Sequence, residues 1–92
     1  MKLLIQKGKE CWFCKTTYNL HKHHIYYGTA NRKISEKIGA YVYLCSRHHN
    51  MSDNSVHFNR EMDLILKKKY QKEFEKQKTR EEFVKIIGKS YL

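Results

Sequence analysis

The chain has 92 residues, of which 19 are Lys or Arg and 9 are Asp or Glu, so its net charge is +10 with neutral histidines. This length allows one domain, and the sequence contains neither the ~18 apolar residues of a membrane span nor the apolar run of a signal peptide. We therefore expect an intracellular protein with no membrane association. Its charge attracts polyanions such as nucleic acid, although a solvated basic surface explains the charge as well.

The first predicted elements are a strand and a short helix. Residues 20–27 combine aromatic and aliphatic side chains and end at Gly28, a pattern typical of a strand that enters a turn. Residues 31–39 predict a short helix, with Asn31 as its N-cap and Gly39 just beyond its last turn.

A second strand and a long helix follow. Residues 41–44 are β-branched or aromatic and predict a strand, with a short helix or turn beginning near Ser46. Asn59 is the predicted N-cap of a long helix that has one apolar face. That face consists of Met62, Ile65 or Leu66, Tyr70 and Phe74. The lysines at 67–69 and 72 are expected on its solvated faces.

A capping box predicts one more helix near the end of the chain. Thr79 and Glu82 have the spacing in which each side chain bonds the backbone of the other residue, and Gly88 ends the helix. The inward-facing residues would be Phe83, Ile86 and Ile87. Together these elements predict an α+β fold.

Two pairs of residues predict a zinc site. Cys11 and Cys14 are separated by two residues, as are Cys45 and His48. Two such pairs can close a tetrahedral site, and soft thiolate ligands favour zinc. Three cysteines in an intracellular protein favour metal ligation or free thiols over disulfides. The competing interpretation is that the cysteines are small buried hydrophobic residues.

Four of the six histidines are candidates for a second site: His23, His24, His49 and His57. Adjacent residues of a strand point to opposite faces, so His23 and His24 share a site only if the strand bends or bulges. Neighbours on a helical turn also diverge, so His49 can serve a different ion from the zinc candidate His48. Each histidine alone has a simpler explanation: an exposed strand residue, a core histidine bonded to a carbonyl, or a residue that precedes a helix.

In their order along the chain, these motifs resemble the HNH endonuclease superfamily. The matching segments are Cys11-x-x-Cys14, Leu20-His21-Lys22-His23-His24-Ile25, Leu44-Cys45-x-x-His48-His49-Asn50 and Val56-His57. More narrowly, the chain resembles small phage-type HNH proteins, including the RecA-dependent recombination-enhancement nucleases. The segments that carry this narrower resemblance are Arg32-Lys33-Ile34-Ser35-Glu36 and the aromatic-rich end at 83–92. The combination of motifs is specific.

The resemblance implies a single domain, residues 1–92. It implies a small ββα-metal core, treble-clef-like and held by structural zinc, at 1–58, followed by C-terminal helices at 59–92. It places the protein in the cytoplasm of a bacterial or phage-infected cell.

The resemblance also assigns roles to the histidines. His24 corresponds to the general base of the family, and His23, His49 and His57 correspond to ligands of one divalent catalytic ion. Imidazole ligands accept Mg²⁺, Mn²⁺, Ni²⁺ or Zn²⁺. One position departs from the family: Ala40 stands where the family has an Asn that holds the hairpin and orients the base. Substitutes for that Asn would be Asn50 and Asn54.

The expected activity is metal-dependent hydrolysis of DNA phosphodiester bonds. In that reaction an imidazole takes a proton from water near neutral pH. Lys22, Arg32 and Arg47 would position the DNA backbone without reading bases. The alternative, which Ala40 favours, is a non-catalytic zinc-stabilised module that binds DNA or a recombination protein.

Overall fold

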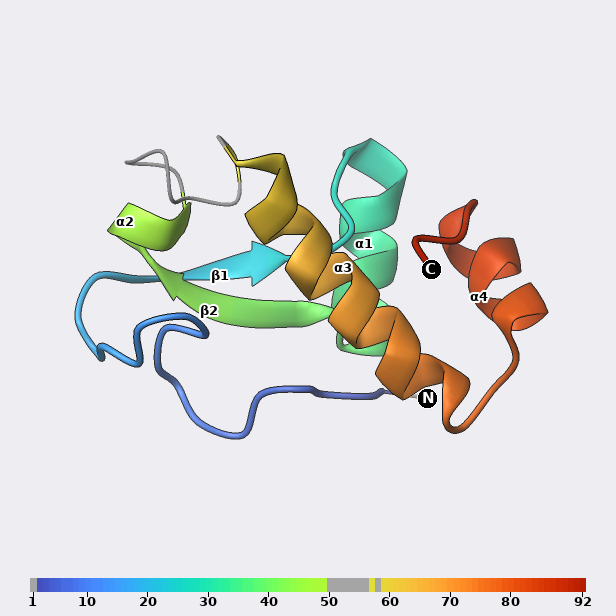
Figure 1. The fold of residues 1–92 in the computed structure, drawn as a ribbon, viewed down its shortest axis with the longest axis horizontal. Helices are drawn as coiled ribbons and strands as arrows, with labels where there is room; N and C mark the ends of the chain where they lie inside the picture. Colours follow the sequence, from blue (N-terminus) through green and yellow to red (C-terminus); the bar gives the residue numbers. More distant parts are fainter. Residues whose placement is uncertain (1, 50–56, 58) are drawn as a thin grey trace.

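The computed structural model describes residues 2–49, 57 and 59–92, which form a mixed α+β fold (Figure 1). The described strands are β1 (Leu20–His24) and β2 (Tyr41–Cys45). The described helices are α1 (Thr29–Ile38), α2 (Ser46–His49), α3 (Arg60–Glu75) and α4 (Arg80–Ile87). None of these helices is long and apolar enough to cross a membrane.

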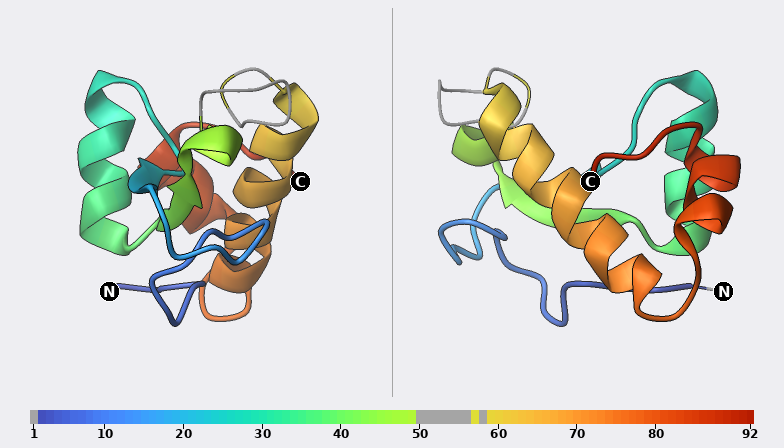
Figure 2. Two further views of the ribbon diagram at one scale, coloured as in Figure 1. Left: turned by 90° about the vertical axis from the view of Figure 1, so that its left-hand side faces the viewer. Right: turned by 45° about the vertical axis from the view of Figure 1, so that its right-hand side comes forward.

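The two strands form an antiparallel sheet that lies between α1 and α3 (Figure 2, left). Its register is unbroken from one end to the other, so β1 contains no bulge. Val42 and Leu44 are buried on the side of the sheet that faces the core. Lys22, His24, Tyr41 and Tyr43 share the opposite side, which we call the outer face of the sheet.

β1 is shorter than the sequence predicts, because the chain leaves the strand after His24 to enter the core. Tyr26 is 1% exposed and lies against the rings of Tyr70, Phe83 and Tyr91. Its backbone N–H donates to Ser35 Oγ at 3.1 Å, and the Ser35 hydroxyl donates to the Tyr26 carbonyl at 2.6 Å. A side chain of α1 therefore replaces the strand ladder at this point.

The prediction that Asn31 caps α1 is wrong. The helix begins two residues earlier, at Thr29, with Gly28 as its N-cap and no side-chain hydrogen bond to its first N–H groups. Gly28 has a φ of 101°, a conformation that glycine adopts without strain. The predicted end is confirmed: Gly39 is left-handed, and a Cβ there would lie 2.6 Å from the carbonyl oxygen of Leu3.

The two C-terminal helices supply much of the core. Leu66, Tyr70 and Phe74 follow each other at four-residue spacing and are fully buried. Phe83 and Ile87 are buried from α4. Of the two alternatives in α3, Leu66 is the buried one and Ile65 is 49% exposed, whereas Ile86 of α4, predicted to face inward, is 36% exposed. Ile65 and Ile86 each lie one residue outside the buried stripe of their helices.

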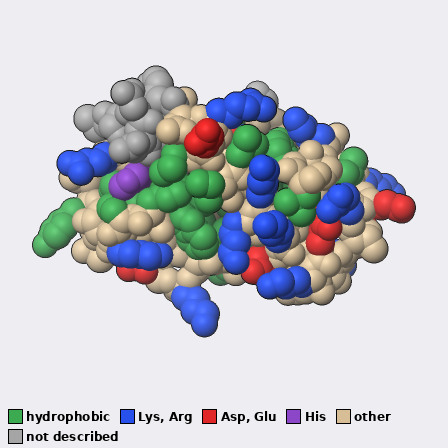
Figure 3. Space-filling model, in the orientation of Figure 1, with side chains coloured by type: hydrophobic (Ala, Val, Ile, Leu, Met, Phe, Trp, Pro, Cys, Tyr) green, Lys and Arg blue, Asp and Glu red, His purple; other side chains and the backbone are tan. Residues whose placement is uncertain are grey.

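The other two predicted N-caps are confirmed. The Asn59 side chain accepts from the first turn of α3, and Thr79 and Glu82 form a complete capping box at α4. The α3 side of the molecule carries Lys and Arg side chains with acidic ones among them, as expected of a solvated face (Figure 3). Lys67 is the exception, because it is 8% exposed and its Nζ lies 2.7 Å from Asp63 Oδ2.

Candidate functional site

Four predicted zinc ligands converge at one end of the sheet, and we call them the zinc cluster: Cys11, Cys14, Cys45 and His48. The first two come from the loop before β1, where the Lys15 N–H bonds the Cys11 carbonyl in a tight turn. The other two come from the last residue of β2 and from α2. Their ligand atoms all lie within 4.8 Å of one another.

Two of the three closest distances within the zinc cluster match those around a tetrahedral ion, and the third is a few tenths of an ångström shorter. The two sulfur atoms of Cys14 and Cys45 are 3.7 Å apart, and the His48 Nδ1 lies 3.2 Å from Cys45 Sγ and 3.6 Å from Cys11 Sγ. Tetrahedral zinc bonds of ~2.3 Å to sulfur and ~2.0 Å to nitrogen imply ligand separations of about 3.5–3.8 Å. A 3.7 Å separation is too long for a disulfide. The cluster is therefore compatible with structural zinc.

The electrostatics of Cys11 favour the thiolate that zinc requires. Burial opposes its ionisation, but the backbone N–H groups of Cys14, Cys45 and Phe13 outweigh burial and lower the pKa of the Cys11 thiol to about 6. Hydrogen bonds from N–H groups stabilise a thiolate in this way.

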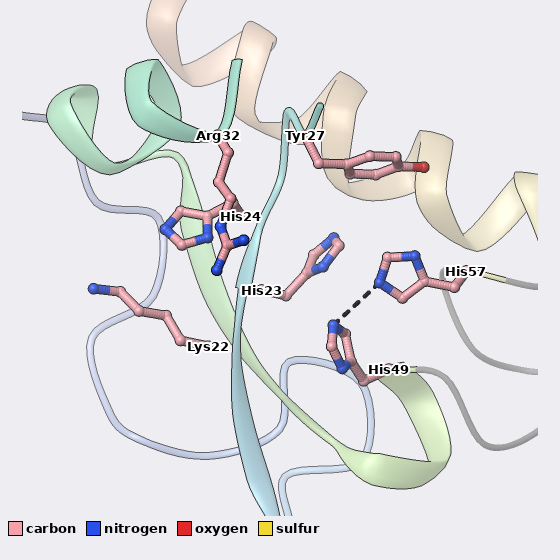
Figure 4. Close-up of a pocket in the computed structure, with 7 residues that line it drawn as sticks. All are labelled: Lys22, His23, His24, Tyr27, Arg32, His49 and His57. Carbon is pink, nitrogen blue, oxygen red and sulfur yellow. Dashed lines mark hydrogen bonds between the residues drawn. The ribbon is translucent and has the colours of Figure 1, made fainter. Parts of the chain in front are cut away.

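A second group of imidazoles, which we call the histidine cluster, lies beside the sheet: His23, His49 and His57. His23 comes from β1, His49 from the end of α2, and His57 from the turn before α3. The Nε2 atoms of His49 and His57 are 3.2 Å apart, and all three imidazoles turn toward one another (Figure 4). The ligand atoms lie within 4.8 Å of one another.

The histidine cluster is electrostatically suited to a cation. His23 is 3% exposed, and its buried Nε2 has no hydrogen-bond partner among the described residues. Burial, together with His49, His57 and Lys67, lowers the pKa of His23 to about 3. Burial, together with His57 and His21, lowers the pKa of His49 to about 4. Both imidazoles are thus neutral near pH 7 and have lone pairs available for a metal ion.

The histidine cluster and His24 line the same pocket, of about 250 Å³. Its lining residues are Lys22, His23, His24, Tyr27, Arg32, His49 and His57. His23 and His24 point to opposite faces of β1 and still line one pocket, because the pocket extends across the strand. Figure 4 shows His24 and Lys22 on one side of β1 and the histidine cluster on the other. Among the described residues β1 pairs with β2 alone, so its other edge is open to the pocket. No bend of the strand is needed.

No protein-family model matches this chain, and comparisons with curated proteins and with solved structures found no significant match. The chemistry of the site therefore rests on the residues and the geometry described here.

Three residues of the site were missed in the sequence. The Glu36 carboxylate binds two predicted residues, His24 Nε2 at 3.1 Å and Lys22 Nζ at 2.7 Å. His21 Nδ1 lies 3.1 Å from His49 Nδ1, on the side away from His57. Tyr27 forms one wall of the pocket. Period-two alternation places His21 on the same face as His23, a signal that the sequence contains.

The electrostatics of Glu36 follow from these contacts. The hydrogen bond from Lys22, assisted by the one from His24, holds the pKa of Glu36 below its usual value. Glu36 is therefore an ionised acceptor near pH 7. Because a carboxylate can only accept, the bond to His24 requires a proton on Nε2, so in the neutral form of the ring Nδ1 carries the lone pair.

The predicted DNA-contacting residues separate into two places. Lys22 and Arg32 line the pocket that straddles β1, and Figure 4 shows the Arg32 guanidinium beside the His24 ring. Arg47 instead lines a different pocket beside the zinc cluster, together with Cys14 and Cys45.

Ala40, the position at which the sequence departs from the HNH pattern it resembles, is fully buried. Ala40 is 0% exposed, and its carbonyl accepts from the Ile25 N–H at 2.8 Å. The Ser35 hydroxyl joins α1 to the chain just after β1, as the hydrogen bonds to Tyr26 show. The predicted substitutes Asn50 and Asn54, and Val56 of the matching segments, lie outside the described residues.

Proposed function

We propose that this protein is a metal-dependent DNA endonuclease of the HNH type, with a treble-clef-like ββα-metal core. One observation carries the proposal: the three imidazoles of the histidine cluster, a fourth imidazole and two cationic side chains meet in a single pocket. Hydrolysis of a phosphodiester needs a base for water, positive charge on the phosphate and stabilisation of the leaving oxygen. The pocket contains groups for each of these tasks.

His24 is the proposed general base. Its Nε2 faces the Glu36 carboxylate, so Nδ1 is the atom that takes a proton from the attacking water. Glu36 would then stabilise the imidazolium that forms and fix the orientation of the ring, as the carboxylate partner of a histidine does in other hydrolases. Glu36 and the Ser35 hydroxyl together do the work that the family's Asn would do at Ala40.

His23, His49 and His57 are the proposed ligands of the catalytic ion. Three imidazole nitrogen donors fit a divalent cation and leave coordination positions for phosphate. When bound, such an ion supplies positive charge for the scissile phosphate and for the departing 3′ oxygen. His21 orients His49 by occupying its second ring nitrogen, which leaves His49 Nε2 for the ion.

Lys22 and Arg32 are the proposed phosphate-binding residues. Their positive side chains line the pocket beside His24, where a phosphate adjacent to the cleaved bond would lie. Contacts of this kind position DNA without reading its sequence, and binding should weaken steeply with added salt.

The test is cleavage of supercoiled plasmid by the zinc-loaded protein with Mg²⁺, Mn²⁺, Ni²⁺ or added Zn²⁺. We expect nicking that chelator abolishes and that the His24→Ala variant reduces about 100-fold or more, the usual contribution of a general base. The matched control is Lys85→Ala, an exposed residue of α4 far from the pocket, which should cleave like the wild type.

Two outcomes would contradict the proposal. Undiminished cleavage by His24→Ala would remove His24 from the role of base. Retardation of DNA without chelator-sensitive cutting of supercoiled, linear or single-stranded substrates would favour the alternative, a zinc-stabilised binding module. Circular dichroism of each variant shows whether a loss of activity reflects a loss of fold.

A further inference from the structure

The outer face of the sheet pairs aromatic rings with lysines. Lys22 Nζ lies 4.1 Å from the centre of the Tyr41 ring, and Lys2 Nζ approaches the same ring at 5.5 Å. Lys9 Nζ lies 5.3 Å from the centre of the Tyr43 ring. Both tyrosines are partly exposed. Because they are two residues apart on one strand, their rings project from the same face at a spacing of about 7 Å.

Lys2 and Lys9 belong to the N-terminal segment, which hydrogen bonds hold along β2. The Leu3 N–H donates to the Ile38 carbonyl at 2.8 Å, and the Tyr43 N–H donates to Gln6 Oε1 at 2.7 Å. The segment and the two tyrosines enclose a groove of about 240 Å³. The lining residues of this groove are Leu4, Gln6, Lys7, Gly8, Lys9, Tyr41 and Tyr43.

The groove and the catalytic pocket are joined by one residue. Lys22 lines the pocket and also lies over the Tyr41 ring, and the His24 and Tyr41 rings meet edge to face at 6.2 Å. Glu36 neutralises Lys22, whereas Lys7 and Lys9 of the groove carry positive charge without an ion pair within 4 Å among the described residues. A continuous basic and aromatic path thus runs from the pocket across the outer face.

We propose that the outer face binds a single strand of nucleic acid, with bases stacked on Tyr41 and Tyr43 and phosphates against the lysines. Aromatic rings with adjacent cations are how proteins bind single strands with little sequence preference. A duplex keeps its bases stacked inside, where these rings cannot reach them. The proposal that the strand continues past Lys22 into the pocket rests on the proposed endonuclease function, but binding on the outer face does not.

The experiment measures the anisotropy of a short labelled oligothymidylate, and of a duplex of equal length, with zinc-loaded protein and no other divalent ion. In the variant Tyr41→Ala/Tyr43→Ala, the affinity for the single strand should fall at least about fivefold for each ring removed. Its affinity for the duplex should be close to that of the wild type. The variant Tyr41→Phe/Tyr43→Phe keeps both rings and should bind the single strand like the wild type. Tyr18→Ala removes an exposed ring elsewhere, 77% exposed, and is the matched control.

A salt series tests the phosphate contacts separately. Lys9→Ala should make the dependence of single-strand affinity on salt shallower, by about 0.7 in the logarithmic slope for each lost contact. The proposal is overturned if the double alanine variant binds the single strand like the wild type, or if it loses single-strand and duplex binding equally. The latter result would indicate a duplex-binding surface or a misfolded variant.

These outcomes are separable from those of the cleavage test. A wild-type protein that binds single strands through its tyrosines yet cuts nothing would refute the endonuclease and support this surface. A His24→Ala variant that binds like the wild type but does not cut would support both. Cleavage that persists at full rate without tyrosine-dependent binding would refute this surface alone.

Discussion

Replacement of the Ser35 hydroxyl tests whether its hydrogen bonds to Tyr26 hold α1 against the chain that follows β1. Replacing it in Ser35→Ala removes the acceptor of the Tyr26 N–H and the donor to the Tyr26 carbonyl, in a region where both residues are at most 1% exposed. A buried polar group left without a partner costs about 1–3 kcal/mol. Two such groups predict a loss of about 2–6 kcal/mol in the free energy of unfolding, a large part of the 5–15 kcal/mol typical of a domain.

The assay is urea unfolding at fixed zinc concentration, followed by far-ultraviolet circular dichroism. The matched control is Ser90→Ala, whose partly exposed hydroxyl accepts from Gln71 Nε2 and donates to the Leu92 carbonyl; without it, Gln71 Nε2 keeps its hydrogen bond to Glu75 Oε2. We expect the control to lose about 1 kcal/mol or less. If Ser35→Ala loses no more than Ser90→Ala, the reasoning that this hydroxyl braces the turn after β1 is refuted.

Three further predictions concern the metal, an ion pair and a turn. Removal of zinc from the zinc cluster by a chelator should unfold the protein. The reason is that the binding free energy of structural zinc, about 10–16 kcal/mol, is also folding free energy. A circular dichroism spectrum that the chelator leaves unchanged would contradict this prediction. Asp63→Ala leaves Lys67 without its buried partner and should lower the free energy of unfolding by about 3–5 kcal/mol, whereas Glu73→Ala removes only solvent-exposed ion pairs and should change the free energy of unfolding little. Gly39→Ala forces a left-handed alanine against a backbone oxygen and should cost more than about 1 kcal/mol by urea unfolding, whereas Gly8→Ala meets nothing within 4 Å and should change little.

The features that could be predicted from the sequence are those encoded by neighbouring residues. The caps at Asn59 and Thr79 depend on side chains within three positions of the bonds they make, so spacing alone reveals them. The zinc cluster also follows from spacing, because each pair of ligands sits on one turn. The buried stripe of α3 follows from helical periodicity, except that periodicity does not choose between Ile65 and Leu66.

What the sequence could not supply are contacts between distant segments. Glu36 meets His24 only because α1 packs beside the sheet, and Lys67 is covered because the Tyr27 and Tyr91 rings from other segments lie against it. Asn31 is a better capping residue than Gly28 by local preference, yet the turn after Tyr27 starts the helix earlier. The open edge of β1, which lets neighbouring histidines share a pocket, is a property of the whole sheet.

The four residues of α2 link the zinc cluster and the histidine cluster. His48 belongs to the zinc cluster and His49 to the histidine cluster, and no residue separates them. A change in the position of one is therefore transmitted to the other within a single helical turn. For a protein proposed to hold zinc and to cut DNA, this link implies that loss of zinc would displace His49 together with His48, so that cleavage would depend on an ion that takes no part in the reaction.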